Sequence, residues 1–143
     1  REVYYWDSYW IVKGLLVCGR LREAEDIVRN LLYLVERFGF VPNGNRTYYL
    51  NRSQPPMLSL MVYELSKHMD NDRALLEYAI PLLVHEYMFF EQRRKVGLGS
   101  ELGQVYNLNG YIVDGASNPR PESFRDDSQI AKSCFASEEK RAA

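Results

Sequence analysis

Apolar residues recur at every third or fourth position between residues 21 and 38, and this period constrains the fold more than any other feature. Such spacing places apolar side chains on one side of an α-helix and leaves the charged residues on the other. The expected buried stripe is Ala24, Ile27, Val28, Leu31, Leu32, Leu34 and Val35. Gly39 follows, and glycine often ends helices because it adopts a left-handed conformation at no steric cost. The sequence therefore predicts a helix over residues 21–38.

The same period predicts four more helices, over residues 7–18, about 56–69, about 70–94, and from 128 to the last residue. Asp7 is expected to cap the first of them or to lie in its first turn. The apolar face of this helix is expected to consist of Trp10, Ile11, Gly14, Leu15 and Cys18. Pro81 lies inside the fourth pattern, where it either kinks the helix or begins a new one. The core of the later helices is expected to include Tyr63, Tyr78, Tyr87, Met88, Phe89 and Phe90.

Short links and long polar segments alternate along the chain. The link between the first two helices is so short that they must pack antiparallel. Residues 40–56 and 114–127 have no helical period and are rich in turn residues. Residues 105–113 alternate around Asn109-Gly110, a dipeptide typical of two-residue hairpin turns. The sequence predicts an all-α fold of antiparallel helix pairs with long polar loops and a short β-hairpin near residues 105–113.

Composition excludes several classes of function. The chain has 143 residues, one domain's worth or less, and its 18 Lys and Arg against 19 Asp and Glu argue against a nucleic-acid partner. No apolar run approaches the roughly 18 residues that span a bilayer. The two cysteines, Cys18 and Cys134, are too few for a disulfide framework, and their spacing fits no metal site. Cys18 is expected to be a buried thiol.

Three segments combine aromatic rings with planar hydrogen-bonding groups, and each precedes a predicted helix: residues 1–10, 41–56 and 118–127. Rings can lie against the C–H faces of a sugar, while carboxylate, amide and guanidinium groups bind pairs of hydroxyls. We interpret the three segments as a sugar-binding surface. Each has an alternative interpretation: Asp7 as a helix cap, Arg46 and Arg52 as surface charges, and the third segment as a solvated charge run. The second segment also contains two glycosylation sequons, at Asn45 and Asn51.

These segments resemble motifs of the trehalases, glycoside hydrolases built on an α/α toroid. Residues 1–9 are similar to the second half of the family's first signature. Residues 42–44 with 52–56, and residues 120–125, are similar to two further motifs in the expected order. The resemblance implies a partial (α/α)6 toroid that needs no cofactor and acts on a small molecule. It also implies hydrolysis of α,α-trehalose to two glucose molecules with inversion.

Carried over motif by motif, the resemblance also implies substrate contacts. They would come from Trp6, Asp7, Asn43, Arg52, Ser53, Gln54, Arg120, Pro121 and Glu122, with Tyr4 and Arg125 as additional candidates. Inversion uses two carboxyl groups roughly 6.5–9.5 Å apart, one acid and one base. In the family the acid lies in a Ser-Gly-Trp-Asp motif, which we expect just after Ala143. We therefore expect no catalytic carboxylate among these residues, and a catalytic domain that is incomplete at both ends.

Two alternatives stay open. Antiparallel helix pairs are also typical of helical-repeat scaffolds that bind other proteins, although no constant repeat length is present. Another α/α-toroid glucosidase or phosphorylase is the second alternative. The sequence does not indicate a compartment.

Overall fold

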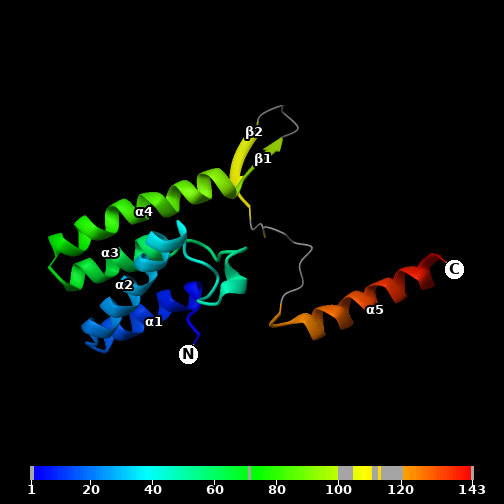
Figure 1. The fold of residues 1–143 in the computed structure, drawn as a ribbon, viewed down its shortest axis with the longest axis horizontal. Helices are drawn as coiled ribbons and strands as arrows, with labels where there is room; N and C mark the ends of the chain where they lie inside the picture. The colour runs from blue at the N-terminus through cyan, green and yellow to red at the C-terminus, as the bar shows by residue number, and fades with distance from the viewer. Residues whose placement is uncertain (1, 71, 100–104, 111–112, 114–120, 143) are drawn as a thin grey trace.

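A computed structural model describes residues 2–70, 72–99, 105–110, 113 and 121–142, with only the backbone described after residue 134. Its helices and strands are α1 (Tyr5–Val17), α2 (Leu21–Phe38), α3 (Leu58–His68), α4 (Arg73–Arg93), β1 (Lys95–Gly99), β2 (Val105–Asn109) and α5 (Phe124–Ala142), with a 3₁₀ turn at Thr47–Tyr49. Helices α1 to α4 pack together, and α5 lies apart from them (Figure 1). Within the described part of the chain, no helix combines the length and the hydropathy that a membrane span needs.

Helix α2 lies at the centre of the four-helix body and contacts α1, α3 and α4 (Figure 1). It begins and ends where the sequence predicts, and the expected stripe faces the core, with five of its seven residues buried and Ile27 and Leu34 partly buried. Gly39 ends it with φ +81°, and its N–H donates to the Val35 carbonyl at 2.7 Å. The core around it is apolar and includes Val12, Leu16, Ala24, Val28, Leu31, Leu32, Val35, Met61, Leu65, Leu75 and Ala79.

Helix α4 is continuous across Pro81, so the proline does not begin a new helix. Asp72 caps its N-terminus, because the carboxylate accepts the N–H groups of Ala74 at 2.8 Å and Leu75 at 3.4 Å. These bonds satisfy two of the four N–H groups that a helix start leaves open. Helix α4 is thus one uninterrupted helix from Arg73 to Arg93, just before the hairpin.

The apolar face predicted for α1 is wrong. Trp10 and Ile11 are 54% and 51% exposed, and the Cys18 thiol is exposed rather than buried. The buried positions are Tyr5, Ser8, Val12 and Leu16. Because α1 carries apolar residues on more than one side, periodicity alone did not distinguish the side that packs on α2 and α3. The same limit applies to α3 and α4, where Tyr63, Tyr78, Tyr87 and Met88 are exposed, Phe89 is half-buried and Phe90 is buried.

The β-hairpin forms earlier in the chain than predicted. Strands β1 and β2 pair antiparallel, from Lys95 opposite Asn109 to Gly99 opposite Val105. Asn109-Gly110 therefore lies at the open end of the hairpin, where the Gly110 N–H donates to the Arg94 carbonyl at 2.6 Å. Both strands are largely exposed, so no buried face specified which segments pair. Helix α5 also begins earlier than expected, at Phe124 rather than residue 128, with two aspartates in its first turn that favour a helix start.

Candidate functional site

Two β-bridges organise the first and second polar segments: one joins them, and the other closes the second segment on itself. Tyr4, just before α1, pairs with Gly44, and Pro42 pairs with Ser53 within the second segment. Gly44 permits this close approach, because an added Cβ would lie 2.9 Å from the Tyr49 ring and 3.1 Å from the Val3 carbonyl oxygen. The start of α1 and both ends of the 41–56 segment therefore meet.

Backbone hydrogen bonds bring the candidate residues of these two segments together. The Tyr5 N–H donates to the Asn43 carbonyl at 3.3 Å, and the Asn43 N–H donates to the Arg52 carbonyl at 3.0 Å. The Gln54 side-chain oxygen accepts the Trp6 N–H at 2.7 Å. Gln54 thus satisfies one of the open N–H groups at the start of α1.

Arg52 connects the second segment to the third. Its side chain is 8% exposed and forms an ion pair with Glu122. Its guanidinium also lies 5.0 Å from the centre of the Tyr49 ring. A planar cation held from two sides has a fixed orientation, which suits it to present N–H groups to paired oxygens. Arg52 is therefore no free surface charge.

The rest of the third segment is less engaged. Pro121 is exposed, and Arg125 lies exposed in the first turn of α5. Arg120 lies outside the described residues. Among the predicted site residues of this segment that the structure describes, Glu122 is the one that contacts the second segment.

Asp7 is not the cap of α1. It lies in the first turn, while Tyr4 occupies the cap position without a side-chain cap bond. The Asp7 carboxylate is exposed and makes no hydrogen bond or ion pair with a residue of the described ranges. It lines a hollow of about 560 Å³ together with Tyr4 and Ile11. The carboxylate is therefore available to accept hydrogen bonds from the hydroxyl groups of a ligand. Trp6 beside it is 39% exposed.

Ser53 and Gln54 line a different cavity, of about 220 Å³, which the buried Arg94 also lines. Asp7 and Ser53 therefore do not share one enclosed pocket within the described ranges. The residues around the two cavities are connected by hydrogen bonds such as that between Trp6 and Gln54, and the two cavities share no lining residue. Those same ranges contain no group of three or more His, Cys, Asp or Glu side chains placed to hold a metal ion.

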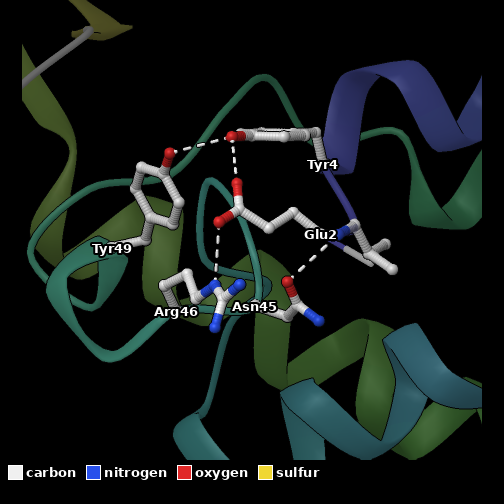
Figure 2. Close-up of polar contacts among 6 residues, drawn as sticks. Glu2, Tyr4, Asn45, Arg46 and Tyr49 are labelled. Atoms are coloured by element: carbon white, nitrogen blue, oxygen red, sulfur yellow. Dashed lines mark hydrogen bonds and ion pairs between the residues drawn. The ribbon is translucent and has the colours of Figure 1, made fainter. Parts of the chain in front are cut away.

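Tyr4 belongs to a polar cluster that sequence reasoning missed (Figure 2). Its hydroxyl donates to Glu2 at 2.6 Å and lies 3.1 Å from the Tyr49 hydroxyl, while Arg46 Nε donates to Glu2 at 2.8 Å. The hydrogen bonds from Tyr4 and Arg46 lower the pKa of Glu2, and the bond to Glu2 raises the pKa of Tyr4. Glu2 is therefore ionised and Tyr4 protonated at neutral pH. The alternation of Glu2 and Tyr4 before the helix was the available signal.

The cluster also fixes the sequon residue Asn45, whose Oδ1 accepts the Val3 N–H at 3.0 Å (Figure 2). Oδ1 of the other sequon residue, Asn51, is buried without a hydrogen-bond partner in the described part of the chain. The side-chain oxygen of Asn45 is thus hydrogen-bonded within the protein, and that of Asn51 is buried in it. Within the described residues, the site is a set of oriented amide, guanidinium, carboxylate and ring groups.

Comparison with known proteins identifies the family of the chain that carries this site. The family model described as Trehalase matches residues 1–143. The chain belongs to the trehalase family. It is 47% identical over 132 residues to a probable trehalase of Oryza sativa subsp. japonica, covering 92% of this chain and 23% of that protein. It is 44% identical over 130 residues to a trehalase of Homo sapiens, covering 91% of this chain and 22% of that protein.

A solved structure supports the same assignment. The neutral trehalase Nth1 from Saccharomyces cerevisiae matches with a TM-score of 0.75 at 29% identity, over 96% of this chain and 25% of that one. The antiparallel helix pairs are those of an α/α toroid, as the family resemblance predicted. This trehalase-family chain spans about a quarter of the length of the relatives it matches.

Proposed function

We propose that this chain is part of the single catalytic domain of an α,α-trehalase, a glycoside hydrolase that converts α,α-trehalose to two glucose molecules with inversion. In this proposal the domain is incomplete at both ends of the chain. Residues 1–143 supply substrate-recognition loops, and both catalytic carboxylates lie outside them. The observation that carries the proposal is Arg52, which is held between Tyr49 and Glu122 while its backbone carbonyl accepts the N–H of Asn43.

The chemistry of the candidate groups fits a neutral disaccharide. An uncharged molecule covered with hydroxyls is bound by many oriented donors and acceptors rather than by one ionic clamp. The proposed contacts are Trp6, Asp7, Asn43, Arg52, Ser53, Gln54, Arg120, Pro121 and Glu122, with Tyr4 and Arg125 in addition. The ion pair leaves Arg52 and Glu122 with further donor and acceptor sites for sugar hydroxyls.

The activity is tested with a polypeptide of the relatives' length that contains this chain. We expect it to release glucose from trehalose, and not from maltose or kojibiose, without added phosphate. Inversion predicts that proton NMR at early times finds α- and β-glucose in equal amounts, whereas retention would give α-glucose alone. Cleavage that requires phosphate, or that prefers another glucoside, would support the toroid phosphorylase or glucosidase alternative.

The scaffold alternative is tested by substitution at the site. We expect Arg52→Lys to lower kcat/KM for trehalose by about tenfold or more, because lysine lacks the planar guanidinium that lies between Tyr49 and Glu122. Arg29→Lys is the matched control, since Arg29 pairs with Glu25 on the exposed side of α2. A protein that only binds a partner would have no turnover to lose, and equal effects of the two variants would contradict the proposed role of Arg52.

A further inference from the structure

A buried phenol–carboxylate pair adjoins the site, because Tyr5 directly precedes Trp6 in α1. Tyr5 of α1 is 1% exposed and Glu86 of α4 is 3% exposed. The Tyr5 hydroxyl donates to the Glu86 carboxylate, at 2.8 and 3.0 Å to its two oxygens. The same hydroxyl accepts the N–H groups of Met57 at 2.9 Å and Leu58 at 2.8 Å. A phenol has one donor and two acceptor positions, so all three are used.

The carboxylate also reaches the second polar segment, because Glu86 accepts a hydrogen bond from the backbone of Val41. The pair therefore ties together α1, α4, the start of α3 and the beginning of the 41–56 segment. These anchor points are close in sequence to the proposed substrate residues. Tyr5 precedes Trp6, and Val41 lies two positions before Asn43.

A pair of this kind is a costly way to fill a core. Burial raises the pKa of Glu86 to about 7, which measures how unfavourable the charged carboxylate is there. Apolar side chains of similar volume would pack without that penalty. Apolar side chains would lack directional hydrogen bonds, however. A buried network whose hydrogen bonds are all satisfied specifies one arrangement of the segments that it joins.

We propose that Tyr5 and Glu86 are positioning residues of the sugar site: they hold the start of α1 and residues 41–57 in the relative placement that aligns Trp6, Asp7, Asn43 and Arg52. This inference rests on the proposed function. Both side chains are buried below the loops and act through the backbone that they hold. Their loss therefore weakens substrate binding and turnover without removing any group that touches substrate.

The test compares Glu86→Gln and Tyr5→Phe with two controls in the full-length protein. Tyr78→Phe removes a phenol–carboxylate bond of 3.3 Å to Glu36 that is exposed and joins α4 to α2. Val28→Ala destabilises the core of α2 without touching the site. Well below the unfolding temperature, we expect the first two variants to lower kcat/KM for trehalose by about tenfold with a raised KM. Both controls should stay within about twofold of the wild type.

Amide hydrogen exchange gives a readout that does not depend on turnover. The N–H groups of Trp6 and Asn45 are bonded between the first and the second polar segment, so they report on the relative placement of these segments directly. We expect them to exchange faster in Glu86→Gln and Tyr5→Phe than in Val28→Ala. A wild-type protein without trehalose hydrolysis would refute the proposed function, and the exchange comparison would still decide the positioning role. Loss of stability alone, with kinetics and exchange as in Val28→Ala, would overturn the inference.

Discussion

Arg52 and Glu122 form the ion pair that links the second and third polar segments. The Arg52 side chain is 8% exposed and that of Glu122 is 31% exposed. Removing one partner of such a pair leaves a largely buried cation without its counter-charge, although solvent at Glu122 reduces the cost. The pair should therefore matter for stability as well as for the site.

We expect Glu122→Gln to lower the free energy of unfolding by about 1 kcal/mol and kcat/KM for trehalose by about tenfold or more. Glutamine keeps the shape of the side chain but lacks the negative charge. Thermal unfolding and glucose release of the full-length protein measure the two effects. Glu25→Gln is the control, because it breaks the more exposed pair with Arg29 on α2. Equal losses in both variants would contradict a special role for Glu122.

Glu86 predicts a pH dependence of stability. Its pKa in the folded protein is about 7, against 4.5 without the fold, because burial disfavours the carboxylate. Between these values the folded state binds more protons than the unfolded state. The contribution of Glu86 to stability is therefore highest below pH 4.5 and falls as the pH rises through 7, by up to about 3 kcal/mol.

This loss should be absent from Glu86→Gln, which cannot ionise. We expect the stability of the variant relative to wild type to rise between about pH 5 and about pH 8. Thermal unfolding of both proteins across this range measures the difference. Val28→Ala changes no ionisable group, so its difference from wild type should stay level. A level difference for Glu86→Gln as well would show that Glu86 does not titrate as its burial indicates.

Residue chemistry allowed part of the site to be predicted. The mixing of rings, carboxylates and amides predicted three short segments, and the structure brings the segments of Trp6, Arg52 and Glu122 together. The individual substrate contacts follow from the family resemblance and stay a prediction. Glu86 was missed, although it lies on the buried side of α4 between Ala79 and Phe90. A lone acid at core spacing was the available signal, but its partner Tyr5 is 81 positions away in the chain. Sequence spacing carries no information on such a distant contact.

At the scale of elements, the glycine that ends α2 gives a sharp prediction. Gly39 has φ +81° and nothing within 4 Å of an added Cβ, so a substitution there meets backbone strain and no clash. We expect Gly39→Ala to lower the free energy of unfolding by about 1 kcal/mol. Gly14→Ala is the matched control, because Gly14 lies inside α1 with equally open space around it. There alanine should stabilise by up to about 1 kcal/mol.

Thermal unfolding of the two variants in the full-length protein tests this prediction, and a shift of the same sign in both would contradict it.

The helices and strands differ in how well local sequence predicted them. Helix α2 has one apolar stripe and a glycine stop, so its bounds and its buried face could be read from local sequence. Helix α1 is apolar on several sides, and the hairpin strands are exposed on both faces. In these elements the packing partner determines which face is buried and which strands pair, and local sequence does not specify that partner.

At the scale of the whole molecule, exposed apolar side chains predict how the isolated chain behaves. On α1, Trp10, Ile11 and Val17 are 54%, 51% and 88% exposed, and on α4 Ile80 and Val84 are each 54% exposed. Contiguous exposed apolar surface on a free polypeptide favours association. The chain also spans only about a quarter of the length of its relatives.

We therefore expect the isolated 143-residue polypeptide to aggregate. We also expect it to release no glucose from trehalose, because the proposed function places the acid and the base outside its residues. Size-exclusion chromatography with light scattering measures association, and an enzymatic glucose assay measures hydrolysis. The full-length protein, assayed in parallel, should be active and should not aggregate. Trehalose hydrolysis by the 143 residues alone would require catalytic carboxylates within them, and the exposed Asp7 would then be the first residue to substitute.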